Sequence, residues 1–337
     1  GITMISITDI AKKAGVSSSM VSRVLNGKRY VNPEKREQIL KLIRQTGYVP
    51  NRSARSIAME RSFTIAIVIP DTFNMFQRQL FSIIERHLVS FGYHIIFFLV
   101  KWGVTSEKEC LTRLMGEKLD GVIMLHEVKL PEFYKYLESI KLPVISTMCN
   151  YNKIPTIKVD DKQAAYEGME HLIGLGHRGI AMICGNGFSF GAKRAEGYFK
   201  ALSEHGIARD ENRLVYVPQY TPEAGMYGMR ELLLRSRDFS AVFACSDELA
   251  LGAMRTLQDE NYRIPQDISL IGFDDIDTSS YLFPRLTTIR QPIQEIGEQS
   301  ALYLHRIING QDSRDLEQII PHRLIVREST ARLRSPS

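Results

Sequence analysis

Three consecutive serines and an arginine one helical turn later form the first group of residues with recognisable chemistry. Ser17, Ser18 and Ser19 precede Arg23, and residues four apart share a helix face. Hydroxyl groups can bond to phosphates and base edges, and a guanidinium can donate two hydrogen bonds to O6 and N7 of guanine. This spacing indicates a surface that contacts DNA, although a plain three-helix bundle with serine caps would show the same residues.

A second group of polar and aromatic residues follows the ends of strand-like runs. In open parallel α/β sheets, ligands bind beyond the carboxyl ends of the strands. The candidates under this rule are Asp71, Phe73, Asn74, Phe76, Trp102, His126, Glu127, Met148, Asn150, residues 185–189, Tyr220, Ser246, Asp247, Asp274 and Asp275. Aromatic faces with a few polar groups suit a polyhydroxylated ring. The plainer alternatives are a packed surface residue for Trp102 and a helix cap for Asp274.

Three short helices within residues 1–47 must hold the first group. Start and stop signals for these helices occur at Ser6, Gly15, Ser17, Asn26, Asn32, Pro33 and Gly47. Asp9, at the third position of the first helix, favours the helix start electrostatically. Residues 48–61 form a basic, mostly polar connector with a helix-capable run over 51–59.

From Phe63 onward, short apolar runs alternate with amphipathic helical runs. We expect strands at 63–69, 93–100, 120–125, 143–147, 156–159, 179–184, 213–217, 240–245 and 268–273. Helices are expected between most of them, for instance at 75–91, 161–175, 222–236 and 247–259. Such alternation is typical of parallel sheets covered on both faces. Nine or more strands exceed one small unit, so the pattern predicts two doubly wound α/β subdomains.

The charge is unevenly distributed along the 337 residues. Residues 1–61 carry twelve Lys and Arg against four Asp and Glu, whereas the remainder carries a small acidic excess. A basic head on a mildly acidic body favours a polyanionic partner for the head, and a solvated charged surface is the alternative. The sequence contains no long apolar run and no secretory leader pattern, so we expect a cytoplasmic protein with no membrane span. The four cysteines lie far apart and are expected to be buried free thiols.

Two patterns could indicate a cofactor or a metal ion. Gly185-x-Gly187-x-x-x-Gly191 lies between a strand and a helix, but its spacing departs from the dinucleotide-binding pattern. Asp274, Asp275 and Asp277 lack further ligands at calcium-loop spacing. No nucleophile elbow, zinc-protease motif or phosphate loop occurs. We therefore expect no enzyme activity, no cofactor and no metal.

Several motifs in order along the chain resemble those of the lactose/galactose repressor family. They cover about residues 6 to 330: Asp9-Ile10-Ala11, Gly15-Val16-Ser17, residues 21–26 (VSRVLN), residues 47–51 (GYVPN), residues 175–178 (LGHR), residues 246–252 (SDELALG), residues 271–275 (IGFDD) and residues 286–289 (LTTI). Several long motifs together are far more specific than one short pattern. The resemblance implies a helix-turn-helix domain followed by a periplasmic-binding-protein-like core.

The resemblance also implies roles for individual residues in DNA binding. Ser18, Ser19 and Arg23 would contact bases, and phosphates would be held by Ser17, Ser22, Asn26 and Asn32. The connector, with Asn51 and Arg55, is similar to the family's hinge helix, which inserts an apolar side chain into the minor groove. That position holds Ile57 where Leu is usual, and Met20 stands where Thr is usual. These two departures put the operator sequence in doubt.

For the effector, the resemblance narrows the crevice to Phe73, Arg194, Tyr220, Ser246 and Asp274, with Arg194 and Asp274 as the leading pair. Asn74 and Trp102, which follow strand-like runs, complete the expected effector site. A surface salt bridge is the plainer alternative for Arg194. The implied domains are residues 1–47 (helix-turn-helix), 48–61 (hinge), 62–160 with 291–322, and 161–290 with 323–337 (the two core subdomains).

We therefore expect a homodimeric repressor of a catabolic operon, bound to pseudo-palindromic double-stranded DNA and controlled by a small carbohydrate. A sugar-binding protein without DNA function is the alternative, but it leaves the basic head unexplained. A nucleotide-dependent enzyme on doubly wound domains lacks a catalytic constellation.

Overall fold

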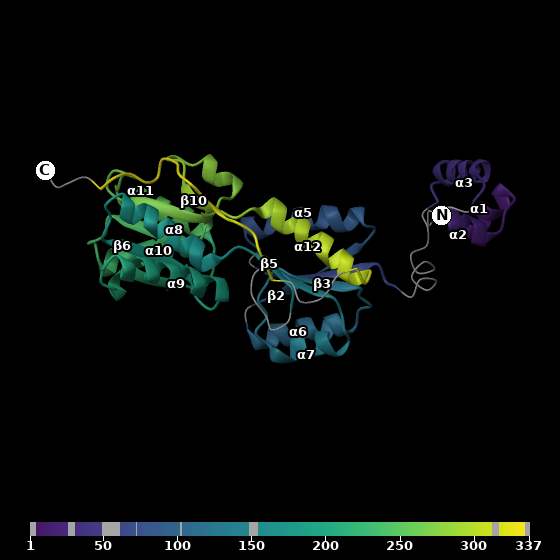
Figure 1. The fold of residues 1–337 in the computed structure, drawn as a ribbon, viewed down its shortest axis with the longest axis horizontal. Coiled ribbons are helices and arrows are strands. Elements are labelled where there is room, and N and C mark those ends of the chain that lie inside the picture. Colours follow the sequence, from purple (N-terminus) through teal and green to yellow (C-terminus); the bar gives the residue numbers. More distant parts are fainter. Residues whose placement is uncertain are drawn as a thin grey trace. The chain divides into compact units, whose positions relative to one another are not determined.

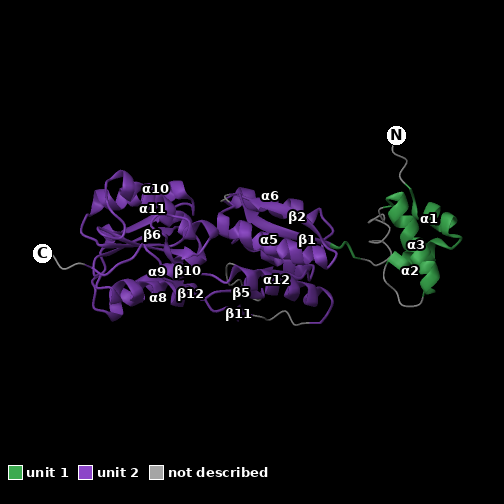
Figure 2. Cartoon of the chain, turned by 90° about the horizontal axis from the view of Figure 1, so that it is seen from above, with its two compact units in different colours: residues 1–63 green, residues 64–337 purple. Residues whose placement is uncertain are grey.

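The chain forms two compact units, residues 1–63 and residues 64–337 (Figure 1, Figure 2). The computed structural model describes residues 5–25, 31–48, 61–71, 73–101, 103–147, 154–311 and 317–333. The predicted Asn26, Asn51, Arg55, Ile57 and Trp102 sites lie outside these residues, as do Met148, Cys149 and Asn150.

The first unit, which we term the head, contains three helices: α1 (Ile7–Ala14), α2 (Ser18–Leu25) and α3 (Pro33–Thr46). The expected caps are confirmed. Ser6 Oγ accepts from Asp9 N at 3.2 Å, Ser17 Oγ accepts from Met20 N at 3.3 Å, and Asn32 Oδ1 accepts from Glu34 N at 2.8 Å. Gly15, at φ 64°, ends α1 in the left-handed conformation that glycine adopts without strain.

One face of each head helix packs into a small apolar core. Ile10, Ala11, Val21, Val24 and Ile39 are all at most 4% exposed. Because the buried residues of α2 lie on one side, the polar residues of this helix are left on the other side.

In the second unit, which we term the core, the first of two six-stranded sheets is entirely parallel. Its strands, in spatial order, are β11 (Glu317–Ile319), β5 (Thr156–Lys158), β4 (Val144–Ser146), β3 (Gly121–Met124), β1 (Thr64–Pro70) and β2 (His94–Val100). On one face lie α5 (Met75–Ser90) and α12 (Ile293–Ile308), and on the other α6 (Val104–Met115) and α7 (Pro131–Ser139) (Figure 1). We term this sheet with its four helices the first subdomain.

The second sheet has the order β12 (Arg323–Ile325), β10 (Thr287–Arg290), β9 (Ser269–Asp274), β8 (Ala241–Ala244), β6 (Ile180–Gly185) and β7 (Leu214–Val217). Its faces are covered by α8 (Asp161–Gly174) with α9 (Ser189–Glu204), and by α10 (Pro222–Arg235) with α11 (Asp247–Asp259) (Figure 2). Two 3-10 turns, Glu211–Arg213 and Asp277–Ser280, complete this second subdomain.

The chain passes three times between the two sheets: from β5 to α8, from β10 to α12 and from β11 to β12. Each crossing continues from the end of a strand. The residues that follow β5 and β10 therefore lie at the junction of the two subdomains. This is where the sequence predicts the ligand crevice.

The nine expected strands are all present, each displaced by no more than one residue at either end. Three further strands, β10, β11 and β12, were not predicted. The last two have three residues each and are partly exposed, so they lack an apolar run. The expectation of purely parallel sheets is wrong at one edge, because β12 pairs antiparallel with β10. None of the helices in the described ranges combines the length and apolar character needed to cross a bilayer.

Candidate DNA-binding surface and effector pocket

The head presents its serines and its arginine on the side of α2 opposite its apolar core. Ser17, Ser19 and Arg23 are exposed, whereas Ser18, Met20 and Ser22 are partly buried. Ser17 Oγ and Ser19 Oγ lie 2.9 Å apart. The arrangement leaves a long cationic side chain next to small hydroxyls, which is the combination that the DNA interpretation requires. Asn32 is exposed at the start of α3 and caps that helix.

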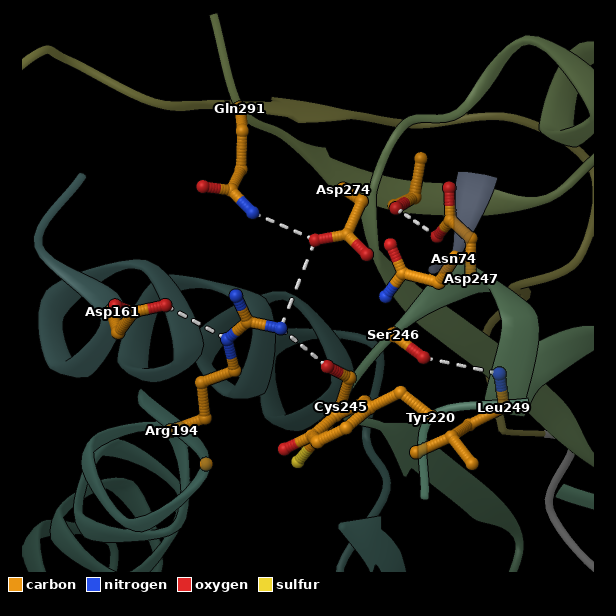
Figure 3. A network of polar contacts seen from close by, with 12 residues as sticks. Asn74, Asp161, Arg194, Tyr220, Cys245, Ser246, Asp247, Leu249, Asp274 and Gln291 are labelled. Carbon is orange, nitrogen blue, oxygen red and sulfur yellow. Dashed lines mark hydrogen bonds and ion pairs between the residues drawn. The ribbon is translucent and has the colours of Figure 1, made fainter. Parts of the chain in front are cut away.

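A small pocket lies between the two subdomains of the core. Its lining residues are Asn74, Phe76, Thr147, Lys158, Asp161, Phe190, Arg194, Tyr220, Asp274 and Gln291, and it encloses about 20 Å³. Four residues of the predicted effector site meet there: Asn74, Arg194, Tyr220 and Asp274. Figure 3 shows these four around one polar network.

Arg194 lies at the centre of this network. Its Nε donates to Asp161 Oδ1 at 2.8 Å, and its Nη1 donates to the carbonyl oxygen of Cys245 and lies 3.7 Å from Asp274 Oδ1 (Figure 3). The guanidinium carbon lies 3.6 Å from the ring centre of Phe273. Arg194 is only 3% exposed, so the alternative of a surface salt bridge is wrong.

Asp274 ends β9 in an unusual backbone conformation. Its φ is 115°, a value that residues with a side chain rarely adopt. The carboxylate accepts from Gln291 Nε2 at 2.7 Å (Figure 3). Burial raises the pKa of Asp274 well above its usual range, and the nearby guanidinium of Arg194 opposes this shift. Strained backbone of this kind clusters at ligand sites, and here the buried carboxylate lines the pocket.

Tyr220 forms an aromatic wall of the pocket together with Phe190, whose ring centre lies 5.1 Å away. Two of the glycines of the suspected dinucleotide pattern make room for this tyrosine. A Cβ atom at Gly185 would lie 2.0 Å from the Tyr220 ring, and one at Gly191 would lie 2.5 Å from its hydroxyl. These two glycines therefore have a packing role.

The structure places two predicted effector residues away from the pocket lining. Ser246 Oγ accepts from Leu249 N at 3.1 Å and caps α11 (Figure 3). Phe73 packs edge-on against Phe81, with ring centres 6.1 Å apart.

Sequence reasoning also missed residues that line the pocket: Thr147, Lys158, Asp161, Phe190 and Gln291. A signal was available for Asp161. It follows Asp160, and one carboxylate is enough to cap α8, because Asp160 Oδ1 accepts from Gln163 N at 3.0 Å. Gln291 was missed because β10, the strand before it, was not recognised.

Two glutamates hold the subdomains together beside the pocket. Glu127 of the first subdomain accepts from Ser189 N, the first residue of α9, at 2.7 Å. Glu248 of the second subdomain accepts from Met75 N, the first residue of α5, at 3.1 Å. Each carboxylate thus caps a helix of the opposite subdomain, where the helix dipole favours negative charge. We term these two contacts the glutamate clamp.

Metal ligands do not gather in the described part of the chain, where no group of three or more His, Cys, Asp or Glu could hold an ion. Asp275 instead pairs with Arg290 and Arg327, at 2.6 Å each. Cys110, Cys184 and Cys245 are buried free thiols.

The fold and these two sites define a DNA-binding head on a periplasmic-binding-protein-like core. Residues 6–51 match the model of bacterial regulatory proteins of the lacI family, and residues 169–330 match that of the periplasmic binding protein-like domain. Catabolite control protein A of Priestia megaterium is 32% identical over 97% of this chain and 99% of that protein.

Two solved structures are similar over most of the chain. The Lac repressor dimer bound to operator and the anti-inducer ONPF has a TM-score of 0.85 and 26% identity, covering 98% of this chain and 100% of that one. A LacI family regulator from Enterococcus faecium with bound ribose has a TM-score of 0.71 and 31% identity, covering 80% of this chain and 100% of that one.

The chain belongs to the lacI family of bacterial regulatory proteins. It is a DNA-binding transcription regulator and not an enzyme. A solute-binding protein without DNA function does not fit a chain whose first 51 residues carry this family's DNA-binding domain.

Proposed function

We propose that the chain represses a catabolic operon in the cytoplasm. A carbohydrate bound in the core pocket would control the affinity of the protein for the operator. The observation that carries the proposal is the buried pair of Arg194 and Asp274 facing the pocket beside Tyr220. A guanidinium and a carboxylate can together bond to adjacent hydroxyls, and an aromatic face suits the apolar side of a sugar ring. The similar regulator with bound ribose supports this ligand class.

In the proposed DNA complex, Arg23, Ser18 and Ser19 contact base edges in the major groove, and Met20 packs beside them. Phosphates are held by Ser17, Ser22, Asn26 and Asn32. The exposed polar side of α2 supports this assignment. Residues 48–61 would form the hinge. In it, Asn51 and Arg55 would contact the sugar-phosphate backbone of the DNA, and Ile57 would enter the minor groove.

The effector would act by changing the angle between the subdomains, whose proposed ranges are 62–160 with 291–322 and 161–290 with 323–337. The membership of the strands in the two sheets supports these ranges. Because the pocket is lined from both subdomains, a ligand of a different size favours a different angle. That angle would set the spacing of two heads on a pseudo-palindromic operator.

A homodimer is the assembly this mechanism requires, and the core exposes apolar residues suited to it. On the edge strand β2, Phe97 is 41% and Leu99 is 54% exposed, and in the loop before β10, Tyr281 and Phe283 are more than 80% exposed. Large exposed apolar side chains of this kind mark protein interfaces. We expect the wild type to sediment as a dimer and Leu99→Asp to sediment as a monomer with an intact core. A dimer unaffected by Leu99→Asp would exclude β2 from the interface.

The DNA-binding proposal is tested by selecting operator sequences with the full chain and with Arg23→Ala. Loss of a bidentate contact to guanine costs about 1–3 kcal/mol per half-site. Across two half-sites, we expect at least about 30-fold weaker binding to the selected operator, with little change on random DNA. Lys41→Ala, which removes the same charge from the exposed face of α3, is the control. An unchanged sequence preference in Arg23→Ala would contradict base contact by this residue.

The effector proposal is tested by thermal-shift screening of sugars with the full chain. A ligand in the pocket should raise the melting temperature of the wild type. Asp274→Asn should remove the shift because the charged carboxylate, with two acceptor oxygens, is replaced by a neutral amide with only one. The control is Asp238→Asn, because Asp238 is an exposed carboxylate on the same subdomain. A sugar whose shift survives Asp274→Asn binds elsewhere, and the pocket would then not be the effector site.

A further inference from the structure

Two of the three nitrogen atoms of the Arg194 guanidinium contact polar groups of the protein itself. Nε is bonded to Asp161, and Nη1 is bonded to the Cys245 carbonyl and lies beside Asp274 (Figure 3). Phosphates and carboxylates are held best by an arginine that offers two parallel N–H groups. The edge of the guanidinium that contains Nε is occupied by Asp161, so it is not available for such a fork.

The guanidinium is also fixed in orientation by aromatic rings. Phe273 lies 3.6 Å and Phe190 lies 5.1 Å from its carbon, measured to the ring centres. Since Arg194 is 3% exposed and Asp161 is 7% exposed, no bulk water is at hand to replace their contact. A guanidinium held in this way cannot turn to present a different edge without breaking the buried ion pair.

The formal charges that line the pocket are balanced. Burial raises the pKa of Asp161 and of Asp274, and the guanidinium of Arg194 opposes this shift by favouring the ionised carboxylates. Lys158 and Arg194 are the two cations and Asp161 and Asp274 are the two carboxylates among the described lining residues. An added phosphate or carboxylate would therefore be buried without a compensating charge, which is strongly unfavourable. A hydroxyl carries no charge and can both donate to Asp274 and accept from the amide of Gln291.

Asp161 is not needed to cap α8. The start of α8 is already capped by Asp160, which is exposed, whereas Asp161 points at the guanidinium of Arg194 (Figure 3). Arg194, Asp161 and Asp274 all belong to the second subdomain, so their contacts persist when the subdomains move apart to admit a ligand.

We propose that Asp161 is a specificity-determining residue that restricts the pocket to uncharged polyhydroxylated effectors and excludes sugars that carry a phosphate or carboxylate. The proposal rests on the proposed function, in that it takes this pocket as the effector site. Asp161 acts in two ways: it occupies one of the two edges of Arg194 that could donate a pair of parallel N–H groups to an anion, and it supplies a negative charge that balances the pocket.

The test compares matched neutral and anionic sugars by calorimetric titration of the full chain. The probes are ribose with ribose 5-phosphate, glucose with glucose 6-phosphate and with glucuronate, and cellobiose. We expect the wild type to bind one or more neutral sugars and to bind the matched anions at least about tenfold more weakly. A wild type that prefers an anion over its neutral partner overturns the proposal, and this comparison requires no variant.

The variant Asp161→Asn keeps the size of the side chain and removes one negative charge from the pocket. We expect the ratio of anion affinity to neutral-sugar affinity to rise by at least about tenfold. Asp160→Asn, which makes the same change on the adjacent exposed residue and keeps a good helix cap, should leave the ratio unchanged. A merely structural role of Asp161 would weaken all ligands alike, so an unchanged ratio in folded Asp161→Asn overturns the proposal.

Failure of the underlying function gives a different result. If Asp274→Asn leaves the binding of every sugar intact, the ligands bind outside this pocket, and both the effector site and the role of Asp161 are refuted. If Asp274→Asn abolishes binding but Asp161→Asn leaves the ratio unchanged, the pocket is the effector site and only the inference about Asp161 is refuted.

Discussion

The polar residues of the two candidate sites are exposed in the head and buried in the core. In the head, Arg23 and Ser19 are exposed on α2 and await a partner outside the protein. In the core, Arg194 is buried and forms ion pairs with the buried carboxylates of Asp161 and Asp274. The head site is thus completed by DNA, whereas most of the core site is completed by folding.

Because of this difference, a substitution at the site in the head should affect binding alone, whereas one at the site in the core should affect both binding and stability. Arg23 is exposed on α2, so its substitution breaks no buried contact and should change DNA affinity with little effect on folding. A substitution in the core network leaves a buried group without its partner, so it should change ligand binding and stability together. Substitutions that compare the two units directly test this contrast.

The largest expected effect concerns how closely each unit is packed. A Cβ atom at Gly252 of α11 would lie 1.9 Å from the backbone oxygen of Pro222 on α10, so Gly252→Ala must push two helices apart. We expect it to lower the free energy of unfolding of the core by about 3 kcal/mol. In the head, a Cβ at Gly15 meets nothing within 4 Å, but φ is +64°, so Gly15→Ala should cost about 1 kcal/mol.

The two glycine variants are measured by urea unfolding. The single tryptophan, Trp102, falls in the core unit by sequence and serves as its fluorescence probe. Circular dichroism of residues 1–63, expressed alone, reports on the head if that fragment folds, and operator binding by the full chain gives a second readout. Equal losses for Gly252→Ala and Gly15→Ala would show that the core is not the more tightly packed unit.

The same contrast explains how much of each site could be predicted from sequence. In the head, Ser6, Ser17 and Asn32 were correctly predicted as caps because capping depends on neighbours within three residues. The exposed face of α2 follows from the spacing of Val21 and Val24, since one helix period determines both faces.

In the core, the strands were predictable from local apolar runs, but the assembled pocket was not. Arg194 and Asp161 are 33 residues apart in sequence, and Gln291 lies beyond a strand that was not recognised. Ser246 and Asp274 each follow a strand expected from the sequence, yet the hydroxyl of Ser246 caps α11. Local pattern places a residue near the carboxyl end of a strand, but the packing of distant elements decides whether it lines the pocket.

The next effect is a pH dependence with opposite sign in the two units. In the core, burial raises the pKa of Asp247 to about 7, although Ser279, Thr288 and Ile276 N all donate to its carboxylate. Folding therefore favours the protonated form, and the stability contributed by this group is lost as the pH rises toward 7. In the head, hydrogen bonds from Ser6 lower the pKa of Asp9. Its contribution is present at neutral pH and is lost in acid.

Between pH 5 and pH 8, we expect wild-type core stability to fall by about 2–3 kcal/mol relative to Asp247→Asn, which keeps the size but does not titrate. The difference between the two proteins is the readout, because burial lowers the pKa of His126 to about 4 and its contribution has the opposite sign. Parallel pH profiles for wild type and Asp247→Asn would refute the titration of Asp247 in this range.

The smallest expected effect concerns the glutamate clamp. The pocket volume is about 20 Å³, far below that of a typical small-molecule site, so a sugar requires the subdomains to part. Glu127 and Glu248 oppose this movement by capping helices across the junction. Replacing either with Gln removes the charge from one cap, which is worth about 1 kcal/mol. We therefore expect each variant to bind a pocket ligand about fivefold more tightly.

The clamp is tested by calorimetry with the same sugar for Glu127→Gln, Glu248→Gln and the double variant. The two caps join different helices, so their effects should add, and the double variant should gain about 25-fold. Glu138→Gln, at an exposed carboxylate in the last turn of α7, is the control. Weaker ligand binding in the single variants would mean that the clamp stabilises the ligand-bound arrangement. The core would then be preformed for its ligand, and the contrast with the exposed head would be stronger.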